Sequence, residues 1–231
     1  MTLPLILLAT LSPALALDAA WQKYSAQLPE EDQKILARIA SLGAFQPDRK
    51  EPYGKVSKKD GVLFLEAFAL IPGEREKALP MAKDFGSYKD WVFQRINERR
   101  DGKGGYLLDI QSMEHLKEDG LLKIWVRLNV LFKGRYFLSL RIDDRLSDPD
   151  VPYLGLKLNK PTTLAPRGQG FFRLYAPHKS KSFVVYFFGE AKPHWAIYYL
   201  LPLSLLQSEA VGRIQAILDN ILLRLRRLGA L

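Results

Sequence analysis

Residues able to carry out chemistry are few in this chain. It contains three histidines, His115, His178 and His194, and no cysteine. The missing cysteines exclude thiolate metal sites and a cysteine nucleophile. His178 and His194 flank one predicted strand region, so the fold could bring them together. Each follows a proline, however, which is more typical of surface loops.

The acidic and glycine-rich segments also lack the spacing of a known site. Four aspartates between residues 143 and 150 offer the carboxylate oxygens that Ca²⁺ prefers, but the glycine and distal glutamate of a calcium loop do not follow. Residues 101–105 (DGKGG) are compatible with a phosphate-binding nest, yet the alternating segment after them indicates a turn before a strand. No nucleophile elbow, H-E-x-x-H or P-loop occurs. The sequence therefore predicts no catalytic residues, no metal site and no cofactor.

Aromatic side chains are concentrated near the C-terminal end. Ten fall within thirty residues: Phe171, Phe172, Tyr175, Phe183, Tyr186, Phe187, Phe188, Trp195, Tyr198 and Tyr199. Packing in an ordinary core explains many of them. Alternation along strands would place others on the wall of an apolar ligand pocket. Interleaved lysines and arginines also suggest stacking with single-stranded nucleic acid, but an apparent export signal argues against a nucleic-acid partner.

Alternation of apolar and polar residues predicts a largely antiparallel sheet. It is clearest in residues 122–130 and 136–142, which form a predicted hairpin with Gly134 in the turn. An earlier strand covers Leu63 to Leu70. Further strands are predicted at residues 106–114, 154–159, 170–176, 182–189 and 195–200. Prolines separate these segments, as expected at strand ends and turns.

Helices are predicted at both ends of the chain. Residues 18–41 are expected to be helical, with Pro29 and the acidic residues after it favouring a helix start. Residues 46–60 are rich in proline, lysine and glycine, and we interpret them as a linker or lid. Residues 204–228 form a long amphipathic helix whose apolar stripe is wider than a surface helix needs.

The first sixteen residues carry no charged side chain and end in Ala14-Leu15-Ala16, the small-x-small pattern of a signal-peptidase site. We predict a cleaved signal peptide over residues 1–16, a helical extension and linker over 17–60, and one domain over 61–231. The expected location is periplasmic or secreted. The net charge of +9 makes an anionic membrane surface a further candidate partner.

One segment carries a family resemblance. After the first strand, Asp84 to Trp91 (DFGSYKDW) places aromatic residues at the turns of two short helices. This motif, the many strands that follow and the closing helix resemble the START-like (SRPBCC) helix-grip superfamily, which includes lipid-transfer domains and polyketide cyclases. The resemblance implies an α+β fold in which a curved antiparallel β-sheet wraps around a long C-terminal helix. It covers about residues 62–227, and the first 60 residues have no counterpart.

The resemblance also implies an apolar ligand site between the sheet and the last helix. Our main hypothesis is an exported protein that binds a hydrophobic small molecule or lipid. A cyclase- or hydrolase-like enzyme and a basic, envelope-associated structural protein are the alternatives, and binding without catalysis is favoured. The oligomeric state is left open. The predicted ligand-binding residues are Trp91, Tyr136, Leu138, Phe172, Phe183, Val185, Phe187, Trp195, Ile214 and Leu218.

Overall fold

A computed structural model describes residues 19–43, 45, 52–92, 107–129, 131 and 133–229. The predicted signal peptide and the turn at residues 101–105 lie outside these residues. The chain divides into two compact units, Met1–Arg49 and Lys50–Leu231. The first unit contains α1 (Ala19–Ser25) and α2 (Glu30–Ser41). The single helix predicted over residues 18–41 is therefore interrupted, because Pro29 begins a second helix.

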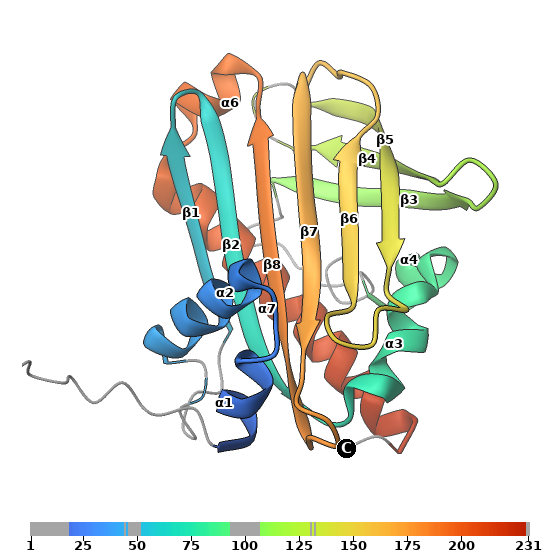
Figure 1. Cartoon of the computed structure of the whole chain (residues 1–231). Helices are drawn as coiled ribbons and strands as arrows, with labels where there is room; N and C mark the ends of the chain where they lie inside the picture. The colour runs from blue at the N-terminus through green and yellow to red at the C-terminus, as the bar shows by residue number, and fades with distance from the viewer. Residues whose placement is uncertain are drawn as a thin grey trace, which may run out of the picture. The chain divides into compact units, whose positions relative to one another are not determined.

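The second unit is built on an eight-stranded antiparallel sheet in the described part of the chain, with strand order β1-β2-β8-β7-β6-β5-β4-β3 (Figure 1). The strands are β1 (Tyr53–Lys59), β2 (Val62–Pro72), β3 (Leu108–Leu116), β4 (Leu121–Leu128), β5 (Gly134–Arg145), β6 (Tyr153–Leu158), β7 (Arg167–Tyr175) and β8 (Ser182–Lys192). The predicted hairpin is confirmed, since β4 pairs with β5 in a continuous register, but Gly134 is the first residue of β5, opposite Leu128, and does not lie in the turn.

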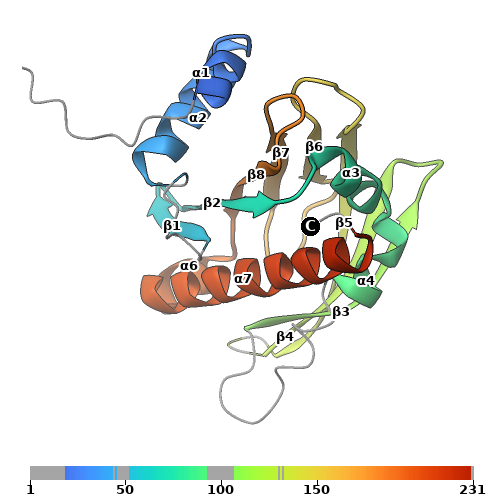
Figure 2. The same ribbon diagram turned by 90° about the horizontal axis from the view of Figure 1, so that it is seen from below.

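The helices of this unit occur at two places along the chain, after β2 and after β8. After β2 come α3 (Arg75–Lys83), the 3₁₀ turn η1 (Phe85–Ser87) and the short α4 (Tyr88–Trp91). After β8 come α6 (Trp195–Leu200) and the 25-residue α7 (Leu203–Arg227). Figure 2 shows α7 running between β2 and β6–β8 on one side and β3 and β4 on the other, which confirms the predicted α+β architecture of a curved sheet and a long C-terminal helix.

Two predictions from the sequence are wrong. Part of the expected linker, Tyr53–Lys59, is strand β1, which pairs with β2 along its whole length. The strand expected at residues 195–200 is helix α6. It starts after Pro193, and the His194 ring nitrogen Nδ1 accepts a hydrogen bond from the Ala196 amide at 3.3 Å. The pairing of β1 with β2 and the His194 cap of α6 thus determine the structure of these two segments. Hydrophobic alternation in the sequence reveals neither of them.

The N-terminal half of α7 is attached to the edge strand β1. The Gln207 side chain accepts from the Val56 amide at 2.6 Å and donates to the Gly54 carbonyl at 2.6 Å. A side chain at Gly54 would bring its Cβ within 3.0 Å of Val211 Cγ2, so glycine permits this close approach. The helix is therefore fixed at the same strand that the sequence suggested was a linker.

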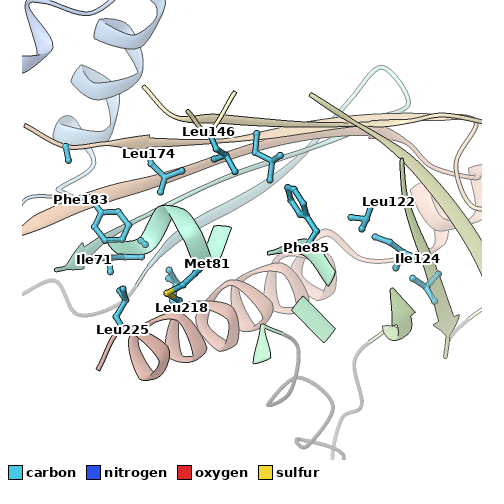
Figure 3. Close-up of a cluster of buried hydrophobic side chains, with 14 of the residues drawn as sticks. Ile71, Met81, Phe85, Leu122, Ile124, Leu146, Leu174, Phe183, Leu218 and Leu225 are labelled. Carbon is cyan, nitrogen blue, oxygen red and sulfur yellow. The ribbon is translucent and has the colours of Figure 1, made fainter. Parts of the chain in front are cut away.

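Buried apolar side chains fill much of the space between the sheet and α7 (Figure 3). Ile71, Leu174 and Phe183 of the sheet belong to the same core as Leu218 and Leu225 of α7. No helix in the described ranges combines the length and hydropathy needed to cross a bilayer.

Candidate ligand-binding cavity

A cavity of about 370 Å³ lies between the sheet and α7. Its walls come from β2, β3, β4, β6, β7 and β8, from the α3–η1–α4 segment and from the middle of α7 between Ala210 and Ile221. The side chains along it are almost all aliphatic or aromatic. A volume of this size falls in the range of roughly 300–1,000 Å³ that small-ligand sites occupy.

The aromatic motif forms one wall. Phe85 is fully buried, and Tyr88 and Trp91 lie edge to face with ring centroids 5.7 Å apart. The Tyr88 hydroxyl donates to the Ala82 carbonyl, and the Trp91 indole nitrogen donates to Ser87 Oγ at 2.9 Å. Burial, together with the negative charge of Asp84, raises the pKa of Tyr88 far above its ordinary value. Its phenol therefore stays neutral, and the polar atoms of both rings are occupied within the motif.

The inner face of the sheet supplies the opposite wall. Phe183, Val185 and Phe187 alternate along β8, so their side chains share one face. Phe172 on β7 stands opposite Phe187, with ring centroids 4.7 Å apart. A Cβ at Gly189 would come within 3.0 Å of the Phe187 ring. The missing side chain at this glycine leaves room for that ring to lie over the sheet.

Arg213 is the one charged residue among the described residues that line the cavity. It projects from α7, and its Nε donates to Glu209 Oε1 at 2.7 Å, one helical turn earlier. Both side chains are mostly buried, at 17% and 18% exposure. The two opposite charges offset each other's cost of burial. The pair adds a polar but electrically balanced group to an otherwise apolar wall.

Seven of the ten predicted ligand-binding residues line the cavity: Trp91, Phe172, Phe183, Val185, Phe187, Ile214 and Leu218. Tyr136 and Leu138 instead lie on β5, partly buried against the hydrophobic core. Trp195 is 62% exposed on α6, because that segment is a helix and not an inner strand. Ligand contact by any of the ten remains a prediction.

The sequence reasoning missed Arg213 as a cavity residue. The available signal was the spacing of Glu209 and Arg213, an i,i+4 pair on a helix otherwise rich in leucine and isoleucine. Met81 on α3 also lines the cavity and was not singled out.

Other polar residues serve the fold locally. Asp148 Oδ1 accepts from the amides of Asp150 and Val151, and Asp144 Oδ1 accepts from the amide of Leu146. The aspartates of this segment thus act as turn acceptors. In the described ranges, no group of three or more histidines, cysteines or acidic residues is placed to hold a metal ion.

No protein-family model and no curated protein matches the chain. Solved structures do. The Zhui aromatase/cyclase from Streptomyces sp. R1128 is 12% identical with a TM-score of 0.50, over 73% of this chain and 96% of that one. A STAR-related lipid transfer protein from Xanthomonas axonopodis is 10% identical with a TM-score of 0.48, over 78% and 96%. A conserved protein from Geobacillus kaustophilus is 13% identical with a TM-score of 0.47, over 70% and 94%.

The similarity to the Zhui structure concerns the fold alone. It agrees with the curved antiparallel sheet and the long C-terminal helix that the described residues form. The resemblance inferred from Asp84 to Trp91 is confirmed at this level.

Proposed function

We propose that the protein binds a hydrophobic small molecule or lipid in the cavity between the sheet and α7. The observation that carries this proposal is the 370 Å³ cavity with its nearly continuous apolar wall. Water gains few hydrogen bonds in such a space, so an apolar occupant is favoured. The names of two proteins of similar fold, a lipid transfer protein and an aromatase/cyclase, support a hydrophobic ligand.

The polarity of the wall narrows the ligand class. A guanidinium has five donors in a fixed fork, so Arg213 can serve a second acceptor while it keeps its bond to Glu209. Because Glu209 already balances the charge, the matching ligand group is a neutral oxygen acceptor such as a carbonyl or hydroxyl. The proposed ligand is therefore an apolar body carrying one such oxygen.

The cavity can be tested by filling it. Ala210 lines the cavity from α7, whereas Ser208 is exposed two residues earlier on the same helix. The neutral fluorescent probe N-phenyl-1-naphthylamine should bind the wild-type protein and the Ser208→Phe control. Ala210→Phe should weaken probe binding by about tenfold or more, since a phenyl ring occupies much of the space.

Two results would contradict the proposal: no probe binding by the wild-type protein, or equal binding by Ala210→Phe and Ser208→Phe. Thermal unfolding of both variants should be recorded alongside, so that a loss of fold is not mistaken for a loss of the site.

A cyclase-like reaction is the second candidate function, and Arg213 is the observation that favours it. A guanidinium beside an apolar wall can polarise a ligand carbonyl by donating a hydrogen bond to its oxygen. Incubation with a poly-β-ketone substrate and detection of a dehydrated, ring-closed product distinguishes this activity from binding alone.

A further inference from the structure

Large apolar side chains are exposed in one short stretch of the second unit. We call Trp195, Tyr199, Leu200, Leu203 and Leu205 the α6 patch. Each of the five is between 41% and 73% exposed, and they span α6 and the first turn of α7. Apolar side chains gathered in this way on a folded surface mark an interaction site more often than chance exposure.

The patch is held firmly by the fold. Ala196 and Leu201 are buried, so the opposite side of α6 packs into the protein. Lys58 of β1 donates through Nζ to the carbonyl of Leu201 at 2.8 Å and to that of Tyr198. The exposed rings are therefore displayed by an anchored helix.

Positive charge predominates at the end of the sheet next to the patch. Figure 1 shows α6 beside the turn between β1 and β2 and beside the end of β8. Exposed cations at this end of the sheet are Lys59, Lys160, Arg167 and Lys192. The loop before β7 is joined to α6, since the His194 amide donates to the Leu164 carbonyl at 2.7 Å. Two acids lie nearby: Asp60 in the turn, and Glu190, which accepts a bond from Gln169. The cations outnumber them.

We propose that the α6 patch docks on the surface of an anionic phospholipid bilayer. Tryptophan and tyrosine favour the headgroup region, where the ring is buried and its polar atom stays hydrated. The leucines reach the upper acyl chains, and the surrounding lysines and arginine meet the lipid charges. This combination of exposed aromatics and a basic border fits an anionic membrane better than a protein surface, whose interface centre is depleted of lysine.

The other end of α7 lacks this combination. Arg226 and Arg227 are exposed there, but Leu228 is the one exposed large apolar residue among residues 216–229. The two ends of a 25-residue helix are about 37 Å apart. Variants at the two ends therefore test two separate surfaces.

The experiment measures co-sedimentation with vesicles of three parts phosphatidylcholine to one part phosphatidylglycerol, and with vesicles of phosphatidylcholine alone. The protein should bind the anionic vesicles and lose binding as salt rises. Trp195→Ser combined with Tyr199→Ser should weaken binding by about tenfold or more. The matched control is Trp125→Ser with Phe137→Ser, a second exposed aromatic pair, 36% and 43% exposed, on β4 and β5; it should bind like the wild type.

A second set of variants, which remove positive charges, compares vesicle binding at the two ends of α7. Lys59→Gln with Lys192→Gln should lower binding by about tenfold or more, since each basic residue near the surface contributes about 1 kcal/mol. Arg226→Gln with Arg227→Gln should change it little. The proposal is overturned if neutral vesicles bind equally or if the control pairs lose binding as much as the patch variants. It is also overturned if gel filtration shows a dimer that Trp195→Ser with Tyr199→Ser dissociates, because a second copy then covers the patch.

This proposal does not depend on a cavity ligand. Ala210→Phe alters the cavity and leaves the α6 patch unchanged, so this variant should still bind anionic vesicles. Loss of probe binding with intact vesicle binding, or the reverse, assigns each result to its own site.

Discussion

The two halves of α7 differ in how they meet the rest of the protein. All four buried residues of the helix, Ala216, Leu218, Asn220 and Leu225, lie in its C-terminal half. The N-terminal half, residues 203–215, contacts strand β1 and lines the cavity at Ala210, Arg213 and Ile214 without a fully buried side chain. The cavity wall continues into the C-terminal half as far as Ile221. The helix is therefore enclosed more completely toward its C-terminal end.

The C-terminal half is fixed by both packing and polar contacts. Leu225 has no exposed surface and belongs to the core with Ile71 and Phe183 (Figure 3). Asn220 Nδ2 donates to the Val92 carbonyl at 2.7 Å, which joins the helix to the end of the aromatic motif. The Arg224 guanidinium lies 5.6 Å from the centre of the Trp91 ring. One continuous apolar stripe thus lines the cavity along the middle of the helix and closes the core toward its C-terminal end, at Leu225.

The largest expected effect is a loss of stability, which should differ between a core residue and a cavity-lining residue of α7. Leu225→Ala should lower the free energy of unfolding by about 2–5 kcal/mol, because it leaves a void in a closely packed core. Ile214→Ala lengthens an existing cavity, so its cost should fall at or below the lower end of that range. Chemical denaturation of both variants measures the difference.

Ile214→Ala should also change the affinity for an apolar probe, and Leu225→Ala should not. Equal losses of stability with unchanged probe binding would show that the N-terminal half of α7 packs as a solid core. The distinction between the two halves would then be lost.

Hydrophobic sequence patterns predict some elements of the fold, such as the β4–β5 hairpin and α7, but not strand β1. Alternation located the β4–β5 hairpin, and the spacing of leucine and isoleucine located α7, because both patterns record which face is buried. Strand β1 was not predicted, because Lys55, Lys58 and Lys59 give it little alternation. Its pairing with β2 is nevertheless local, since Asp60-Gly61, both with positive φ, form the two-residue turn between the strands. An Asp-Gly pair is a recognised hairpin signal and could have located this strand.

The candidate site was predictable only in outline. The inner residues of β8 follow from alternation, and seven predicted residues do lie along the cavity. Trp195 does not, because the choice between helix and strand in its segment depends on the His194 cap. Tyr136 and Leu138 share the inward pattern of their strand but lie on β5, away from the cavity wall. A stripe in the sequence shows that a face is apolar, and the fold decides whether that face meets a neighbour or a space.

A smaller effect concerns the polar group in the N-terminal half. Arg213→Met keeps the length and apolar stem of the side chain and removes its donors. Hydrogen bonds to a charged group contribute about 1.5–3 kcal/mol, so affinity for a ligand with one oxygen should fall roughly tenfold to a hundredfold. Displacement of the bound naphthylamine probe by 1-decanol and by decane measures this.

The substitution should weaken displacement by decanol and leave displacement by decane nearly unchanged. Equal changes for the two competitors would mean that Arg213 shapes the cavity and does not bind the oxygen. Glu209→Gln is the companion variant, since it removes the partner's negative charge, keeps an acceptor oxygen, and should not lower the affinity for decanol.

The smallest expected effect lies next to the aromatic motif that packs against the C-terminal half of α7. His115 on β3 meets Phe85 edge to face, with ring centroids 5.0 Å apart. Partial burial, followed by the positive charge of Lys117, lowers the pKa of His115 below its ordinary value of 6.5, and Asp144 offsets part of this. The fold therefore favours the neutral imidazole.

The sign of the pH dependence follows from this direction. As pH falls through 6.5, the unfolded chain takes up the proton before the folded protein does. The contribution of His115 to stability is present above pH 6.5 and declines as the pH drops toward the lower pKa of the folded state. An NMR titration should place the pKa of His115 below 6.5, and Lys117→Gln should raise it. Denaturation of the wild type and His115→Gln at pH 7.5 and 5.5 should show the wild type losing more stability on acidification. A titration midpoint at or above 6.5 would mean that the Phe85 ring does not shield His115 from water, and that this end of the protein is less tightly closed than its contacts indicate.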